Sequence, residues 1–156
     1  MSAWQFVLND QPMSTLVRSD LSVPAFSGLS DNVNRCASAC FVNQGPIPPG
    51  TYHIVDRPTG GILGGVRDWW SGKSEWFALF ADDGSLDDAM LCDEVSRGNF
   101  RLHPKGPLGI SQGCITVENW NDFQRVRNLL LSETPQPVPG SALTAYGSVT
   151  VRCGQE

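Results

Sequence analysis

The stretch Arg101–Glu118, RLHPKGPLGISQGCITVE, constrains the fold most, because strand-like apolar residues flank a glycine- and proline-rich loop on both sides. This pattern predicts two neighbouring strands that face one loop. His103 lies at the end of the first strand and Cys114 at the start of the second, with ten residues between them. A histidine within hydrogen-bond reach of a cysteine can generate the thiolate, which is the nucleophilic form. The spacing therefore favours a base and a thiol held side by side.

The composition is typical of a folded, loop-rich, mostly β protein. The 156 residues include 16 Gly and 11 Pro, yet 40% are hydrophobic, which predicts one domain spanning residues 1–156 with a real core. A net charge of −5 and the absence of a Lys/Arg run in the sequence argue against nucleic acid and anionic membranes as partners. No apolar run approaches the ~20 residues of a membrane helix. The first residues lack the features of a Sec signal peptide, so we expect a cytosolic protein or export by another route.

The five cysteines leave two interpretations open. They are Cys36, Cys40, Cys92, Cys114 and Cys153. An odd number fits one functional thiol with up to two disulfides, whereas five buried, reduced thiols fit a cytosolic protein about as well. If disulfides form, we expect Cys36 to pair with Cys40 and Cys92 with Cys153. The lack of a C-x-x-C pair and the presence of only two histidines argue against a zinc site, and the acidic segment from Asp82 to Asp88 lacks calcium-loop spacing, so we expect a solvated loop.

Short strands and one clear helix are expected along the chain. The predicted strands are Trp4–Leu8, Ser14–Arg18, Thr51–Val55, Glu75–Ala81 and Leu143–Val151, from apolar alternation between turn residues. Residues 23–50 are expected to be mostly loop, with a short helix over Asn32–Phe41. An amphipathic helix is expected over Trp120–Leu131 with Asn119 as its N-cap. Its apolar positions are Trp120, Phe123, Val126, Leu129 and Leu130.

The residues before Cys114 distinguish it from an ordinary core cysteine. A lone histidine or cysteine near a strand is usually structural. Cys114, however, follows Ser111, Gln112 and Gly113, small and polar residues that suit a tight turn. Gly113 removes side-chain bulk beside the sulfur. The N–H groups around these positions could then form an oxyanion hole.

The motif His103…Ser111-x-Gly113-Cys114 resembles the H-x(n)-S/T-H-G-C signature of the L,D-transpeptidase catalytic domain. The stretches Pro24–Gly28 and Gly45–Tyr52 resemble those of a narrower group, the L,D-transpeptidase-type antibacterial effectors of type VI secretion. This resemblance implies a mainly β, L,D-transpeptidase-like β-sandwich with one or two short helices. It also implies that Cys114 is the nucleophile and His103 the general base, with no cofactor and no metal.

The same resemblance implies a toxin that acts on peptidoglycan stem peptides. Cys114 would attack the carbonyl at the L-centre of meso-diaminopimelate, and D-Ala would leave. Water would then release a tripeptide (L,D-carboxypeptidase), or an amine would take the acyl group (L,D-transpeptidase, including D-amino-acid exchange). The implied partners are the stem peptides, a cognate immunity protein and type VI secretion components. The implied location is secretion without a Sec signal peptide and action in the target bacterium's periplasm.

Other site residues have weaker support from the sequence. The second histidine of the general motif is Gln112 here, so only His103 can be the motif's base, oriented by Ser111 or by a backbone carbonyl. Substrate-binding candidates are Gln112, Arg101, Tyr52 and Ser27, although core, turn or exposed roles are alternatives. Trp69 and Trp70 form either a lid or part of the core. His53 is expected to be structural.

Two rival functions remain open. One is a cysteine amidase or endopeptidase that cuts another bond of the stem peptide. The other is a non-enzymatic, wall-binding β domain in which Cys114 is incidental. Fast labelling of Cys114 by a thiol-reactive probe near neutral pH would favour an enzyme.

Overall fold

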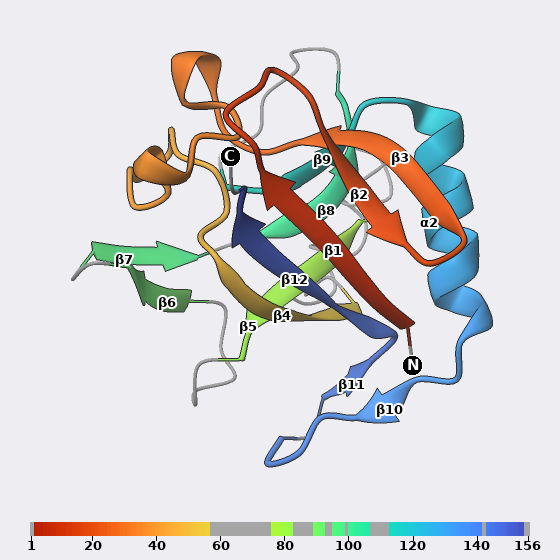
Figure 1. Cartoon of the computed structure of the whole chain (residues 1–156). Coiled ribbons are helices and arrows are strands. Elements are labelled where there is room, and N and C mark those ends of the chain that lie inside the picture. The colour runs from red at the N-terminus through yellow and green to blue at the C-terminus, as the bar shows by residue number, and fades with distance from the viewer. Residues whose placement is uncertain are drawn as a thin grey trace.

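The main sheet of the computed structural model is a closed barrel of eight strands, in the order β1-β12-β4-β5-β8-β9-β3-β2 (Figure 1). The structure describes residues 2–56, 76–82, 89–92, 95–98, 100–106, 113–141 and 143–154. The barrel strands are β1 (Ser2–Leu8), β2 (Ser14–Arg18), β3 (Leu21–Phe26), β4 (Gly50–Asp56), β5 (Phe77–Ala81), β8 (Arg101–Pro104), β9 (Ile115–Val117) and β12 (Gly147–Cys153). The predicted mainly β fold is confirmed, and the sheet closes on itself where a sandwich would divide into two layers.

Smaller elements surround the barrel. They are the hairpin strands β6 (Ala89–Cys92) and β7 (Val95–Gly98), the paired β10 (Gln136–Pro137) and β11 (Thr144–Ala145), the 3-10 turns η1 (Ser30–Asn32) and η2 (Cys36–Ser38), and the helix α2 (Trp120–Ser132). In Figure 1 the β6–β7 hairpin projects from one side of the barrel and α2 lies along the other. Within the described residues, no helix has the length and hydrophobicity needed to span a membrane.

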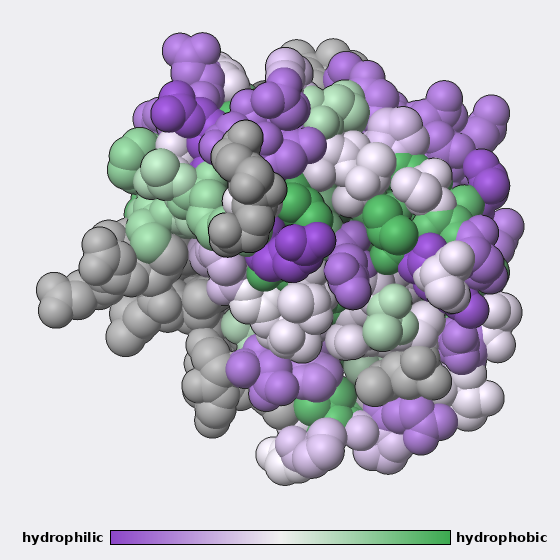
Figure 2. Space-filling model, in the orientation of Figure 1, coloured by the Kyte–Doolittle hydropathy of each residue, from purple (hydrophilic) through white to green (hydrophobic). Residues whose placement is uncertain are grey.

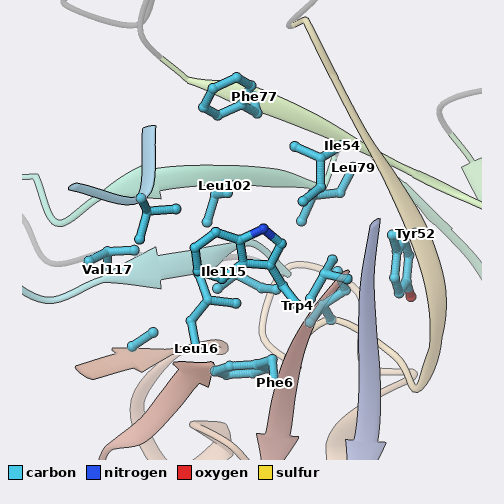
Figure 3. Packing of buried hydrophobic residues seen from close by; sticks show 14 of the residues in the cluster. Trp4, Phe6, Leu16, Tyr52, Ile54, Phe77, Leu79, Leu102, Ile115 and Val117 are labelled. Carbon is cyan, nitrogen blue, oxygen red and sulfur yellow. The ribbon is translucent and has the colours of Figure 1, made fainter. Parts of the chain in front are cut away.

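The core fills the barrel because alternate residues of each strand point inward. On β1 these are Trp4, Phe6 and Leu8, all buried. Figure 3 shows Trp4 near the centre of the labelled side chains, with Phe6 and Leu16 on one side and Leu102 on the other. Full burial of such a side chain contributes about 1.5–3 kcal/mol. The interior of the barrel therefore holds a core of buried hydrophobic side chains.

The outer surface is mostly hydrophilic on the face seen in Figure 2, with hydrophobic residues in separate areas. Outward-facing positions of β1 and β12 include Gln5 and Thr150, both exposed. The large hydrophobic side chains that are exposed come from several different elements: Met13, Val17, Phe41, Val42, Trp120 and Leu131.

Helix α2 begins as the sequence predicted. The Asn119 side chain accepts a hydrogen bond from the N–H of Asn121, which caps the first turn. Phe123, Val126 and Leu130 are buried at helical spacing and join the barrel core. Trp120, the first residue of α2, was expected on this apolar face, but it is 52% exposed.

Residues 23–50 are mostly loop and turn, as predicted, with two differences. β3 continues through Pro24, a residue that argues against a central strand because it has no N–H. Its carbonyl still accepts a hydrogen bond from Glu118 N–H. The helix expected over Asn32–Phe41 is replaced by the turns η1 and η2. Asn34 lies between them with φ 57°, a left-handed conformation that interrupts a right-handed helix.

A disulfide joins Cys36 of η2 to Cys153 of β12, with 117 residues of sequence separation and 5.7 Å between the Cα atoms. Cys40 is also disulfide-bonded, and Cys114 is a thiol. The interpretation in which disulfides form is therefore confirmed, and the functional role of the Cys114 thiol stays a prediction. The predicted pairs are wrong, because Cys36 and Cys153 bind each other and so cannot pair with Cys40 and Cys92.

Candidate active site

The candidate base, His103, is held on the outer side of the barrel wall. Its neighbours Leu102 and Pro104 are buried, and Leu102 belongs to the core, so alternation turns the imidazole to the opposite face of β8. The side chain is nonetheless only 5% exposed. The tautomer of this buried histidine is therefore determined by the protein groups that surround its two ring nitrogens.

A backbone carbonyl selects the tautomer of His103. Nδ1 lies 2.8 Å from the carbonyl oxygen of Pro104. Because a carbonyl oxygen only accepts hydrogen bonds, Nδ1 must carry the hydrogen and donate it. In the neutral imidazole, Nε2 then keeps its lone pair and can accept a proton. A backbone carbonyl was one of the two orienting groups predicted from the sequence; the other, Ser111, lies outside the described residues.

Thr116 contacts the nitrogen that keeps the lone pair. Its Oγ1 lies 3.4 Å from His103 Nε2, and its side chain is fully buried. The two residues are register partners across the parallel strands β8 and β9. Sequence reasoning missed Thr116, because it reads as one β-branched residue of a short apolar strand.

Trp76 covers the flat face of the imidazole. The two ring centroids are 4.3 Å apart and the ring planes differ by 21° (stacked). Trp76 directly precedes Phe77, which pairs antiparallel with Leu102, so one more step in this register brings Trp76 opposite His103. The sequence predicted a strand here but gave Trp76 no role, and it favoured Trp69 and Trp70, which lie outside the described residues.

Cys114 directly precedes β9 and is half-buried. Gly113 before it has φ 89°, a left-handed conformation that favours glycine and forms the turn into the strand. Cys114 lies in the bend before the strand, two residues before Thr116, which is the register partner of His103. That the thiol and the imidazole face each other stays a prediction from the sequence.

Arg101 shares the face of β8 that carries His103. It lies two residues before His103 on β8, and the β8–β9 register, extended by one residue, brings it opposite Cys114. Its guanidinium Nη1 donates to the carbonyl of Phe100, 2.8 Å away. The guanidinium therefore lies against the backbone just before β8.

Two other candidates are Tyr52 and Ser27, whose hydroxyls form hydrogen bonds with buried backbone groups. Tyr52 is fully buried in the core, and its hydroxyl donates to the carbonyl of Pro48. Ser27 is also buried, and its hydroxyl accepts from Ile47 N–H at 2.8 Å. Both contacts fit the core and turn alternatives raised by the sequence, and neither brings these hydroxyls to the face that carries His103. The remaining candidate, Gln112, lies outside the described residues.

The second histidine lies on a different pair of strands. His53 of β4 has its Nε2 3.9 Å from Asp82 Oδ2, just beyond β5. Among the residues that the structure describes, no group of three or more His, Cys, Asp or Glu side chains could hold a metal ion.

One family model matches the chain. It is the model of the Tlde1 domain, and it covers residues 22–141, more than half of the chain. The matched region includes Trp76, His103, Cys114 and Thr116. No curated protein and no solved structure matches the chain.

Proposed function

The chain belongs to the Tlde1 domain family, a type VI secretion effector family, and from this we propose that it is an antibacterial enzyme that cleaves and transfers peptidoglycan stem peptides through Cys114. The observation that carries the proposal is the hydrogen bond from His103 Nδ1 to the Pro104 carbonyl. It leaves a lone pair on Nε2, which would take the proton of Cys114, two residues before the Thr116 partner of His103. The whole chain would act as a single catalytic domain.

The first half of the proposed reaction forms an acyl-enzyme. Nε2 of His103 takes the proton from the Cys114 thiol, and the thiolate attacks the carbonyl carbon at the L-centre of meso-diaminopimelate. The N–H groups of Gly113 and Cys114 would donate to the oxyanion of the tetrahedral intermediate, together with Gln112. The amine of D-Ala then leaves with the proton from Nε2, and a thioester remains on Cys114. Arg101 would bind a substrate carboxylate.

The second half releases the acyl group. Water attacks the thioester while Nε2 takes its proton, and a tripeptide is released; this is L,D-carboxypeptidase activity. If an amine attacks instead, a new amide bond forms; this is L,D-transpeptidase activity, including exchange of D-amino acids. Each route returns the proton from Nε2 to the sulfur, so no cofactor is required.

The disulfides support action outside the cytoplasm. The bond between Cys36 and Cys153 persists in oxidising compartments such as the bacterial periplasm. Delivery by type VI secretion to a target periplasm would place the enzyme beside its substrate. A producing cell would then need a cognate immunity protein as protection.

The test is incubation with purified tetrapeptide muropeptides, followed by mass spectrometry. The wild-type protein should convert tetrapeptides to tripeptides, or exchange the terminal D-Ala when a D-amino acid is supplied. Cys114→Ala should do neither, while its thermal unfolding stays close to that of wild type. Cys114→Ser should be almost as inactive, because a hydroxyl is much harder to deprotonate than a thiol.

Two results would replace the proposal with a rival. Cleavage of a different bond, still dependent on Cys114, would indicate an amidase or endopeptidase. Binding to muropeptides without turnover would indicate a wall-binding domain.

A further inference from the structure

We propose that Trp76 is a positioning residue that stacks on His103 and favours its protonated form, so that Cys114 is a thiolate near neutral pH. The inference rests on the proposed role of His103 as the base for Cys114. It gives a task to a side chain that neither the sequence motif nor the family match assigns.

Three contacts together fix the imidazole. Pro104 O and Thr116 Oγ1 lie at the two ring nitrogens, 2.8 Å and 3.4 Å away, and they hold the ring within its own plane. Trp76 lies against the flat face, with 4.3 Å between the centroids, and it limits motion out of that plane. Together the three contacts fix the orientation of the imidazole, and with it the direction in which Nε2 points.

The stack also acts on the charge of the ring. His103 is only 5% exposed, and burial disfavours a charged imidazolium because water no longer solvates it. The ring planes are within 21° of parallel, so the imidazole meets the negative face of the indole and not its positive edge. A cation within about 6 Å of an indole centroid is attracted by that face. Trp76 thus replaces part of the lost solvation of the imidazolium.

Stabilising the imidazolium stabilises the thiolate. The proton that leaves Cys114 resides on Nε2, so the ion pair of thiolate and imidazolium competes with the neutral pair of thiol and imidazole. A group that favours the imidazolium increases the share of the ion pair at neutral pH. Loss of the aromatic face should lower that share by roughly 2- to 30-fold, the range of cation–π interactions from exposed to desolvated sites.

Alkylation of Cys114 by iodoacetamide measures this share directly. The rate is followed from pH 5 to 9 by the mass of the peptide that contains Cys114, and Cys114→Ala corrects for labelling elsewhere. Trp76→Phe keeps an aromatic face, whereas Trp76→Leu keeps apolar bulk without one. Trp76→Met is measured in parallel as a second apolar side chain, so that the result does not depend on the folding of a single variant.

We expect Trp76→Phe to stay close to wild type. In Trp76→Leu and Trp76→Met the rate at pH 7 should fall by roughly 2- to 30-fold, and the pH of half-maximal rate should move up toward the ~8.5 of an ordinary thiol. If the two apolar variants keep the wild-type pH profile, packing alone explains the stack and the inference is wrong.

The alkylation assay needs no peptidoglycan, so it separates this inference from the proposed function. If the pH of half-maximal alkylation rises in the apolar variants but wild type does not turn over muropeptides, the role of Trp76 is supported and the proposed substrate is wrong. If turnover depends on Cys114 but the pH profile of alkylation is unchanged in both apolar variants, the proposed function is supported and the role of Trp76 is wrong.

Discussion

His103 Nε2 and Thr116 Oγ1 lie 3.4 Å apart across the parallel strands β8 and β9, and both side chains are buried. A threonine hydroxyl can both donate and accept a hydrogen bond. Its oxygen can therefore accept from Nε2–H once Nε2 carries the proton of Cys114, whereas the single lone pair of neutral Nε2 has to be open to the thiol. Thr116 would thus hold the base in its protonated state.

Thr116→Val should slow muropeptide turnover by roughly 2- to 13-fold, which corresponds to one net hydrogen bond of about 0.5–1.5 kcal/mol. Valine has nearly the shape of threonine but no hydroxyl, so the core side of β9 should be unaffected. Thr116→Ser keeps the hydroxyl and should recover most of the rate. Equal rates in Thr116→Val and wild type would show that the hydroxyl is not used.

His103→Ala should reduce turnover on the order of 10²–10⁴-fold, the usual range for a positioned acid–base group. His53→Ala is the matched control, because His53 lies on β4, near Asp82, and not on β8 or β9. Its loss should cost far less. Turnover by both purified variants, with folding checked by circular dichroism, measures the difference. Equal losses in two folded variants would contradict the role of His103.

The disulfide between Cys36 and Cys153 closes a loop of more than 100 residues. Removing it with the double change Cys36→Ser and Cys153→Ser should lower the free energy of unfolding by about 2–5 kcal/mol, because the unfolded chain gains freedom. Guanidinium denaturation without reductant measures the change. Cys114→Ser, outside the disulfides, should keep the wild-type midpoint. An unchanged midpoint in the double variant would mean that the bond contributes little to stability.

Ionisation of the Tyr146 hydroxyl should make the free energy of unfolding depend on pH in the alkaline range. Its hydroxyl donates to Asp56 Oδ1 at 2.9 Å. Burial, followed by the hydrogen bond to Asp56 and its charge, raises the pKa of Tyr146 above the usual 10.0. A pKa that is raised in the folded state contributes stability below pH 10, and that contribution is lost as the pH rises through the folded-state value.

Tyr146→Phe should therefore have a lower melting temperature than wild type between pH 7 and 9. The difference should shrink as the pH rises above 10. Phenylalanine keeps the edge-to-face packing on Phe77, so the comparison isolates the hydroxyl. A difference that is constant up to pH 12 would exclude this ionisation as its source.

Toxicity should depend on the compartment in which the protein is expressed. The proposed substrate lies outside the inner membrane, so expression in the cytoplasm of a test bacterium should be nearly harmless. Fusion to a Sec signal peptide should deplete tetrapeptides, and growing cells should swell or lyse. The Cys114→Ala fusion should be harmless, whereas a toxic wall-binding domain would stay toxic with that change. Strong cytoplasmic toxicity that depends on Cys114 would point to a cytosolic target.

The sequence predicted those strands and helices whose position depends mainly on local patterns of apolar, turn and capping residues. β1, β2 and α2 lie where alternation, turn residues and the cap at Asn119 place them. β3 was missed because Pro24 opposes a strand by local rules, and the barrel tolerates it. The closure of the barrel depends on pairing between strands far apart in the sequence, and no local pattern encodes which strands pair.

In the candidate site, too, local features could be predicted from the sequence and long-range contacts could not. The pairing of β8 with β9 was predicted because a single loop separates the two strands, and the approach of His103 to Cys114 stays a prediction from that spacing. Trp76 was missed because its contact with His103 arises from the pairing of β5 with β8. The disulfide partners of Cys36 and Cys153 were also wrong, because the barrel brings together η2 and β12 across 117 residues.

The parallel pairing of β1 with β12 joins two strands from opposite ends of the described chain. Ser2 pairs with Gly147, so the barrel cannot close on a ribosome-bound chain that has not yet released its last strand. Such high contact order is typical of β domains that fold on the order of milliseconds to seconds. Since β8 and β9 are part of the same closed wall, the thiol and its base should come into register only after β12 has been synthesised. A nascent chain would thus remain inert until folding ends.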